Sequence, residues 1–461
     1  MKMKKFKKTL SVMLVALLVM QLGMGCVGAF AASDYTIVSP YADVEWEGDE
    51  AWGAYKGTLH THTTYSDATE TLSTMIKEYY NQDYDFVANA DHGITGVEWN
   101  KAPEKRFLYN YQLLIGYSFE HLTDEEYEQI TAGSYPLYDG TIRNKEMVCV
   151  TGANEHNHLS LTKNHVNGYF LPEDVGNGPV GGENEYGYEQ AVKFVDECGG
   201  LSHINHPGDW LASNSDMNNV NNKEHIEFFS NLILKYDSCL GMEVFNEDNG
   251  TTGYDRILWD NLLMETLPYG KTVIGFSNTD AHDKENVDTS FSIFMMEKND
   301  VDHIRATMES GAFFGVTRKI RANPVIGPSN EIDAMNKKDI PYPMFKSLTV
   351  DGHKITADVT DATAVQFIAN GEVIHYAPVD GNGTVTLDLD TIENAEDFLY
   401  VRAEIMGEGG MCISQAMIID DGTEPLEFVA PEVSFAESIK LWFRGTILYS
   451  LAMELASLIK G

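Results

Sequence analysis

Between residues 48 and 321, short apolar runs alternate with longer amphipathic stretches, and this rhythm limits the possible folds more than any other feature of the sequence. Such short runs are typical of buried strands and the longer stretches of helices, so repeated strand–helix units are predicted. The expected strands cover residues 57–59, 85–89, 147–151, 200–204, 241–245, 272–276 and 291–296. Seven strands separated by helices favour a parallel α/β barrel over a sandwich.

The pattern changes after Pro324. Runs at 347–350, 364–368 and 384–389 alternate polar and apolar residues, which indicates strands with one buried face. Between them lie Asp351-Gly352, Asn370-Gly371 and the Asp-Gly-Asn-Gly run at 380–383, and such sequences favour hairpin turns. We therefore expect a small all-β, sandwich-like module over residues 340–425.

Two segments stand apart from these units. A tyrosine-rich stretch at 97–146 interrupts the strand–helix rhythm, and we expect it to form a lid that selects the substrate, as loops at a barrel mouth often do. Residues 432–461 place apolar side chains on one helical stripe, but Lys440, Arg444 and Glu454 interrupt it. That segment predicts an amphipathic helix that packs on the protein or contacts a membrane interface, not one that spans a membrane.

The first 31 residues have the features of a secretory signal peptide. Five lysines precede an apolar stretch at 10–22, and Ala29-Phe30-Ala31 forms a cleavage site. Cys26 raises a lipoprotein as an alternative, but the residues before it lack the large apolar side chain usual in a lipidation site. We expect a secreted or extracytoplasmic protein cleaved near Ala31.

The charge balance excludes one large class of partner. With 70 acidic and 32 basic residues the formal net charge is −38, which disfavours a broad surface for nucleic-acid backbone. The four cysteines beyond residue 31 are widely spaced and contain no Cys-x-x-Cys pair, so neither a disulfide framework nor a thiolate zinc site is expected.

Histidine and acidic residues gather at the ends of the expected strands. His60 and His62 lie two residues apart after the first strand, so their side chains share one face. Asp280 and His282 repeat that spacing after the strand at 272–276. Asp67, His92, Glu155 and His206 follow other strands. Nitrogen and carboxylate ligands without thiolate suit Zn, Mn or Fe, and the supply exceeds one ion's needs.

These motifs resemble those of the polymerase and histidinol phosphatase family, called PHP. The resemblance spans about residues 55 to 296 and implies a metal-dependent phosphoesterase on a distorted (β/α)7 barrel, here over residues 48–325. The four matching motifs are His60-Thr61-His62 with Ser66-Asp67, then Ala90-Asp91-His92, then Glu155, then Thr279-Asp280-Ala281-His282. The third motif departs from the family by one extra residue between Gly152 and Glu155.

The resemblance also implies a centre of two or three divalent ions, with Glu155 bridging two of them. The ligands it implies are His60, His62, Asp67, His92, Glu155, His165, His206, Asp280 and His282. His165 fits best as the histidine that follows the third motif, and His156 and His158 are the alternatives. His203, close to His206, is expected to be the general acid, while Asp91 is expected to orient His92.

The function predicted from these residues is hydrolysis of a small phosphate ester, such as a nucleotide or sugar phosphate, by metal-activated water. Lys56, Arg143, Lys163 and His158 are candidates for gripping the phosphate. The alternatives are hydrolysis of an amide or carboxyl ester at the same metals, and a noncatalytic surface protein whose β module binds a polymer.

Overall fold

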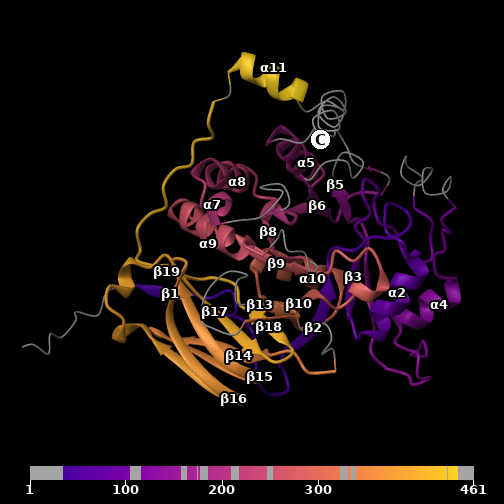
Figure 1. Ribbon diagram of the computed structural model, residues 1–461, viewed down its shortest axis with the longest axis horizontal. Helices are drawn as coiled ribbons and strands as arrows, with labels where there is room; N and C mark the ends of the chain where they lie inside the picture. The colour runs from indigo at the N-terminus through magenta and orange to yellow at the C-terminus, as the bar shows by residue number, and fades with distance from the viewer. Residues whose placement is uncertain are drawn as a thin grey trace, which may run out of the picture.

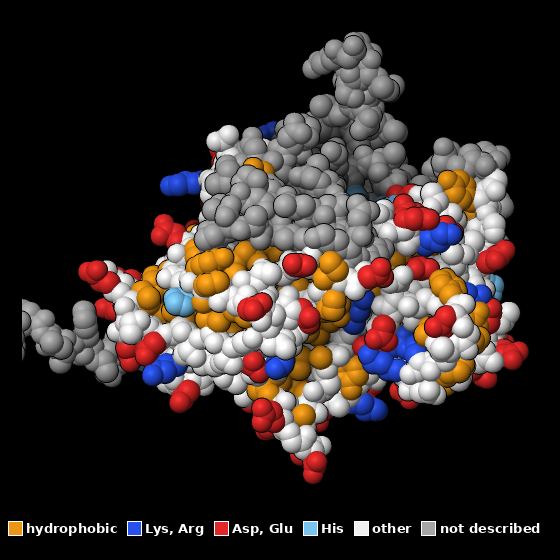
Figure 2. All heavy atoms as spheres, turned by 60° about the horizontal axis from the view of Figure 1, so that its bottom comes forward, with side chains coloured by type: hydrophobic (Ala, Val, Ile, Leu, Met, Phe, Trp, Pro, Cys, Tyr) orange, Lys and Arg blue, Asp and Glu red, His pale blue; other side chains and the backbone are white. Residues whose placement is uncertain are grey.

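The computed structural model describes residues 35–103, 116–156, 164–173, 175–176, 185–208, 217–246, 253–321, 331–333, 339–432 and 434–444. It has a mixed α/β fold with two main sheets and helices around them (Figure 1). On the face shown in Figure 2, acidic side chains are spread widely, as the acidic composition leads one to expect.

The larger sheet has twelve strands and joins the expected barrel segment to the expected β module. Along its main path the strands are β1 (Thr36–Val38), β19 (Met417–Asp420), β17 (Tyr400–Gly407), β18 (Gly410–Ile413), β11 (Phe313–Thr317), β10 (Ser290–Met296), β2 (Gly53–Thr58), β3 (Phe86–Ala88) and β4 (Val148–Val150). From β17 a branch continues through β15 (Lys354–Ala369) to β14 (Met344–Asp351) and β16 (Glu372–Asp388).

The second sheet has five strands and supplies the other half of the expected barrel. In order they are β5 (Asn154–His156), β6 (Val166–Tyr169), β7 (Leu201–Ile204), β8 (Cys239–Asn246) and β9 (Ile274–Asn278). A separate pair contains β12 (Lys319–Arg321) and β13 (Glu331–Asp333).

Helices α2 (Leu72–Asn81), α4 (Asp124–Thr131), α8 (Lys223–Lys235) and α10 (Val301–Ser310) begin at a residue whose side chain caps the first turn. Thr71, Thr123, Asn222 and Asp300 each accept a backbone hydrogen bond at a helix start, which satisfies a donor that the first turn leaves open. The other described helices are α5 (Glu185–Glu197), α7 (Met217–Val220), α9 (Asp255–Thr266) and α11 (Phe435–Arg444).

The seven predicted strands are all present, but the prediction of a closed parallel barrel needs correction. Among the described residues the two sheets do not close into a barrel: the β-bridges of Thr61 with Ala281 and of His92 with Glu155, which lie near the ends of strands from both sheets, are isolated. Strand directions are also mixed, because β10 runs antiparallel to β2 and β6 antiparallel to β7. An apolar run indicates a strand but carries no information on its direction, so the sequence pattern could not distinguish these arrangements.

Two of the three predicted hairpin turns are present in the C-terminal part of the larger sheet. Gly352 and the Asn370-Gly371 pair lie at the turns that separate β14, β15 and β16. The run at 380–383 is not a hairpin turn; it lies within β16, where the pairing with β15 shifts register near Ala362. The division into domains stays a prediction. In the larger sheet, β18 pairs directly with β11 across the expected boundary.

An aromatic layer fills the space between the two sheets. Phe294 stacks on Phe313 with ring centroids 4.6 Å apart, and Phe276 lies 5.3 Å from the same ring. These side chains come from β9, β10 and β11 and are fully buried. Because close packing resists displacement, this layer holds β9, β10 and β11 rigidly in place.

Candidate metal centre

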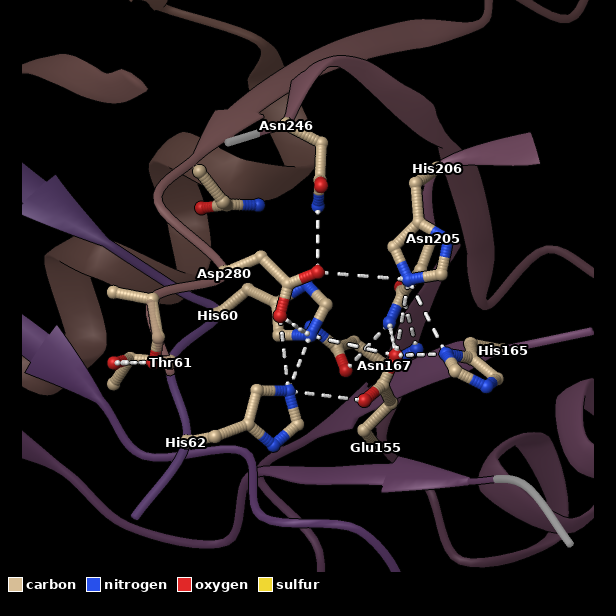
Figure 3. A network of polar contacts seen from close by, with 12 residues as sticks. His60, Thr61, His62, Glu155, His165, Asn167, Asn205, His206, Asn246 and Asp280 are labelled. Atoms are coloured by element: carbon tan, nitrogen blue, oxygen red, sulfur yellow. Dashed lines mark hydrogen bonds and ion pairs between the residues drawn. The ribbon is translucent and has the colours of Figure 1, made fainter. Parts of the chain in front are cut away.

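The strand ends bring the sequence-predicted ligands into one place. Figure 3 shows six of them, His60, His62, Glu155, His165, His206 and Asp280. Two backbone hydrogen bonds hold the first and last motifs together: Asp280 donates to His60 O at 2.9 Å, and His62 donates to Ala281 O at 3.0 Å. Asp280 and His206 have φ values of 45° and 23°, in the left-handed region that such residues rarely adopt. Strain of this kind concentrates at functional sites.

All nine predicted ligands belong to groups whose donor atoms lie within 4.8 Å of one another. Four residues, His60, His62, His92 and Glu155, each belong to two groups, so the groups are contiguous. The groups are His62, Asp67, His92 and His282; His60, His62 and Glu155; His60, His206 and Asp280; and His92, Glu155 and His165.

The tautomers of His60 and His62 follow from their outer hydrogen bonds. His60 Nδ1 lies 2.9 Å from Glu243 Oε1, and because a carboxylate only accepts, the ring donates from Nδ1. His62 Nδ1 lies 3.2 Å from Ser66 Oγ, whose own proton goes to Asp91 at 2.6 Å. Both rings, when neutral, therefore present the lone pair of Nε2 to the centre.

Those two Nε2 atoms converge on a third acceptor. They lie 3.1 Å from each other, and Asp280 Oδ1 is 3.1 Å from one and 3.0 Å from the other. Asp280 Oδ1 and Glu155 Oε2 are buried, and histidine nitrogens face both of them: His62 Nε2 lies 3.0 Å from Asp280 Oδ1, and His92 Nδ1 lies 2.8 Å from Glu155 Oε2. Three acceptors in this arrangement repel one another unless a cation lies among them, so the donor set fits divalent metal ions.

The electrostatics of the metal-free centre agree with this reading. Burial opposes the charge on His92 and on His206, but neighbouring carboxylates raise the pKa of His92 to about 10 and that of His206 to about 9. Burial also disfavours ionised Glu155, yet the imidazoles of His165, His92 and His60 hold its pKa well below the usual range. Without metal, protons must supply the positive charge that this cluster requires.

Two asparagine carboxamides and one further carboxylate orient the ligands through hydrogen bonds. Glu243 accepts from His60 and from the backbone of His206, the latter at 3.0 Å, and it is fully buried. Asn205 donates to Glu155 Oε1 at 2.8 Å, and Asn246 donates to Asp280 Oδ2 at 3.1 Å. Such outer contacts fix ring tautomers and ligand orientation around a metal.

Sequence reasoning missed Glu243. It lies inside β8, within the run predicted as a strand at 241–245. An acid in the middle of an otherwise apolar buried strand was the available signal, because a fully buried carboxylate needs partners.

Of the two described histidines after the third motif, His165 lies at the centre and His156 does not. His165 Nδ1 lies 2.8 Å from Glu155 Oε1, whereas His156 packs against Phe194 with centroids 5.6 Å apart. His158 lies outside the described residues. The extra residue in the third motif does not displace Glu155, which pairs with Asn167 in the sheet and reaches the centre.

Two expected roles do not match the geometry. Asp91 does not hold His92; it accepts from Thr63 at 2.8 Å and from Ser66, and so it fixes the loop that carries Asp67. His203 is not among the grouped ligands. It lies 2.7 Å from Tyr169 Oη and stacks on Phe276, and burial lowers its pKa to about 4. A ring that is neutral at neutral pH is poorly suited to act as general acid.

The basic candidates that the structure describes are engaged elsewhere. Lys56 is buried against Asp288, and Arg143 bonds the backbone of Tyr80 and Tyr84. Lys163 lies outside the described residues. Among the described residues, the carboxylates of Asp67, Glu155 and Asp280 form ion pairs with histidines and with no lysine or arginine.

Comparisons with known proteins give only distant structural likeness. No family model matches the sequence, and no curated protein matches it. A two-domain protein from Bacteroides vulgatus, described as containing a predicted PHP-like metal-dependent phosphoesterase, is 12% identical with a TM-score of 0.41, over 81% of this chain and 98% of its own.

Two other solved structures are similar over shorter parts. The lesion-specific endonuclease EndoQ of Pyrococcus furiosus is 14% identical with a TM-score of 0.29 and 56% of each chain covered. A candidate metal-dependent phosphoesterase from Bifidobacterium adolescentis is 13% identical with a TM-score of 0.28, over 56% of this chain and 98% of its own. Because these scores are low, function has to be argued from the site.

Proposed function

We propose that this chain is a PHP-type metal-dependent phosphoesterase that is exported and acts on a small phosphate ester. The observation that carries the proposal is the convergence of His60 Nε2, His62 Nε2 and Asp280 Oδ1, each an acceptor, within about hydrogen-bonding distance of one another. Nine ligands in contiguous groups support more than one ion. We further propose that the two sheets are an open form of the distorted (β/α)7 barrel.

Some residues of this chain would bind the metal ions, and others would orient the ligands. His60, His206 and Asp280 would hold one ion, and Glu155, shared between groups, would bridge to others. Divalent ions, which we propose to be Mn, Zn or Fe, would supply an activated water and neutralise charge on the phosphoryl group. Glu243 and Asn205 keep the ligands in a fixed orientation, which lowers the reorganisation that the reaction requires.

Contacts between the insertion at 97–146 and the first motif support a role of the insertion in substrate selection. Thr64, in the loop between His62 and Asp67, donates to Ser118 O at 2.8 Å, and Ser73 N donates to Glu120 O at 2.9 Å. Parts of the insertion therefore lie directly on the first motif. We propose that it forms a lid and that the substrate is a nucleotide or sugar phosphate.

One observation favours a second function. Among the described residues, no lysine or arginine forms an ion pair with the carboxylates of Asp67, Glu155 or Asp280, so hydrolysis of a carboxyl ester or amide at the same metals is the alternative. Both reactions use the same activated water. A noncatalytic role is disfavoured because a buried group of acids and imidazoles is costly without a ligand.

The test begins with His60→Ala. We expect the purified protein to contain near-stoichiometric transition metal and to release phosphate from a panel of phosphomonoesters and phosphodiesters. The variant should lose at least about 100-fold in turnover, because it removes a ligand shared by two groups. His375→Ala, on a β-module histidine outside the cluster, is the matched control and should keep full activity.

Two results would contradict the proposal. Metal-loaded protein that cleaves acyl esters but no phosphate ester would favour the alternative. An unchanged rate in His60→Ala would reject the ligand assignment. Export is tested separately, by the mass of the chain recovered from the medium of a secreting host, where cleavage after Ala31 is expected.

A further inference from the structure

Exposed apolar side chains are concentrated near the C-terminal end of the described chain. Ten large hydrophobic residues are exposed among the described residues, and five of them lie between positions 426 and 443. Three of these five belong to α11: Phe435, Ile439 and Phe443 are 82%, 51% and 54% exposed. Because they are four residues apart, they share one face of the helix.

The helix stands away from the core of the molecule. Between β19 and α11 the described residues form neither helix nor strand, and in Figure 1 this stretch runs outside the body to α11, which lies near α5 at the top. Leu426 and Val429 on the stretch are themselves 58% and 77% exposed. An apolar face of this size is unfavourable in water and marks a surface that binds something.

The charge of this segment differs from that of the rest of the chain. Residues 434–461 contain Lys440, Arg444 and Lys460 against Glu437 and Glu454, whereas the whole chain has 70 acidic and 32 basic residues. Most of the molecule would be repelled by an anionic surface, and this segment would not. Phenylalanine on the apolar side with lysine nearby is the composition of helices that lie in a bilayer interface.

We propose that α11 docks on the surface of a lipid bilayer that contains anionic headgroups, with Phe435, Ile439 and Phe443 inserted at the boundary with the acyl chains. None of the described helices has the length and hydrophobicity needed to traverse a bilayer, which agrees with surface docking. This inference does not depend on the proposed phosphoesterase function.

A second copy of the chain is the competing occupant, and the spacing argues against it. A coiled-coil seam alternates steps of three and four residues. In α11 the exposed apolar residues recur in steps of four, at 435, 439 and 443. Each step of four turns the band by about 40° around the helix, which gives a broad face rather than a narrow seam.

The experiment is flotation of the chain beginning at Ala32 with vesicles of phosphatidylcholine and phosphatidylserine. The chain should float with these vesicles, and less with phosphatidylcholine alone. The triple variant Phe435→Ser, Ile439→Ser, Phe443→Ser should bind at least about tenfold more weakly, since it removes the apolar contact. The matched control, Val38→Ser, Val301→Ser, Tyr376→Ser, removes exposed apolar side chains elsewhere and should bind as the parent does.

Equal binding by the parent and the α11 variant would overturn the proposal, as would failure of the parent to float. Light scattering without vesicles tests the competing occupant: a dimer that the α11 variant dissociates would assign the face to a second copy and would also overturn it. Metal content and hydrolysis should be the same in all three proteins, so a failure of docking is separable from a failure of the proposed activity.

Discussion

At the scale of single residues, the centre depends on partners that are distant in sequence. Glu243 bonds His60 from 183 positions away and also holds the backbone of His206. It contributes no atom to the ligand groups, yet it sets which nitrogen of His60 faces the centre. Ligand geometry in this protein is therefore determined as much by the second layer as by the ligands.

Glu243→Gln should weaken metal binding by about 10- to 100-fold. The amide has nearly the same size, but it lacks the negative charge. Its NH2 group would also face N–H groups, such as those of His60 and His206, that now donate to the carboxylate. Isothermal titration of the metal-free protein measures the affinity directly. Glu309→Gln, on the exposed face of α10, is the control; equal affinities for both variants would show that Glu243 is not a positioning residue.

The ligands could be predicted from sequence because the signal is local. A strand followed by two donors two residues apart, as at His60 and His62, places both on one face without reference to the rest of the fold. The role of Glu243 could not be read in the same way, because it arises only when β8 lies beside the first motif. For His203, closeness in sequence to His206 was misleading, since the strand turns the two rings to different environments.

At the scale of elements, a buried ion pair ties the C-terminal strands to the helices. Arg402 on β17 makes two hydrogen bonds of 2.7 Å to Asp260 on α9 and a third, of 2.8 Å, to Glu404. Tyr400 donates to the same Asp260 carboxylate. In its first turn, α9 also accepts from Gly208 N, two residues beyond His206, so this helix contacts both the β module and the site.

Arg402→Met should destabilise the protein by about 3–5 kcal/mol, because it leaves Asp260 charged and buried without its partner. Chemical denaturation measures the change in the free energy of unfolding. Replacing Asp260 by leucine in the same chain should recover much of the loss. Lys298→Met breaks an ion pair on the surface and should have little effect; a similar loss there would point to a general intolerance of methionine.

Strand positions were predictable at this scale, whereas strand partners were not. The seven apolar runs correspond to strands because burial on both sides selects apolar residues at every position. Nothing in those runs encodes that β11 pairs with β18, or that β10 is antiparallel to β2. Short strands such as β5, with the sequence Asn-Glu-His, carry functional residues in place of an apolar pattern and were missed.

At the scale of the whole molecule, metal and protons compete for the same centre. In the metal-free protein, the raised pKa values of His92 and His206, about 10 and 9, mean that both rings are protonated at neutral pH. Metal must displace these protons, so the apparent affinity should rise with pH. Titrations in buffers of different ionisation enthalpy count the protons released between pH 6 and 8, and a count of zero would contradict the protonation of His92 and His206 in the metal-free protein.

Stability should fall as pH rises through the neutral range in the metal-free form but not in the metal-saturated form. A histidine whose pKa is raised by folding stabilises below its unfolded value of about 6.5 and loses that contribution as pH rises through the folded value. Chelated protein should therefore melt at lower temperature as pH rises from about 7 to 9, while metal-saturated protein should not. If the melting temperatures of the chelated and the metal-saturated protein changed with pH in the same way, the histidines would not govern this dependence.

The pairing of β1 with β19 has a consequence for how the chain acquires its structure. Thr36 lies opposite Asp420, so the earliest described strand has no partner until nearly all of the polypeptide has been synthesised. Closing so long a loop is entropically demanding and slow compared with forming a local hairpin. The first and last strands of the larger sheet are thus paired with each other, and β1 can join that sheet only after residues 417–420 have been synthesised.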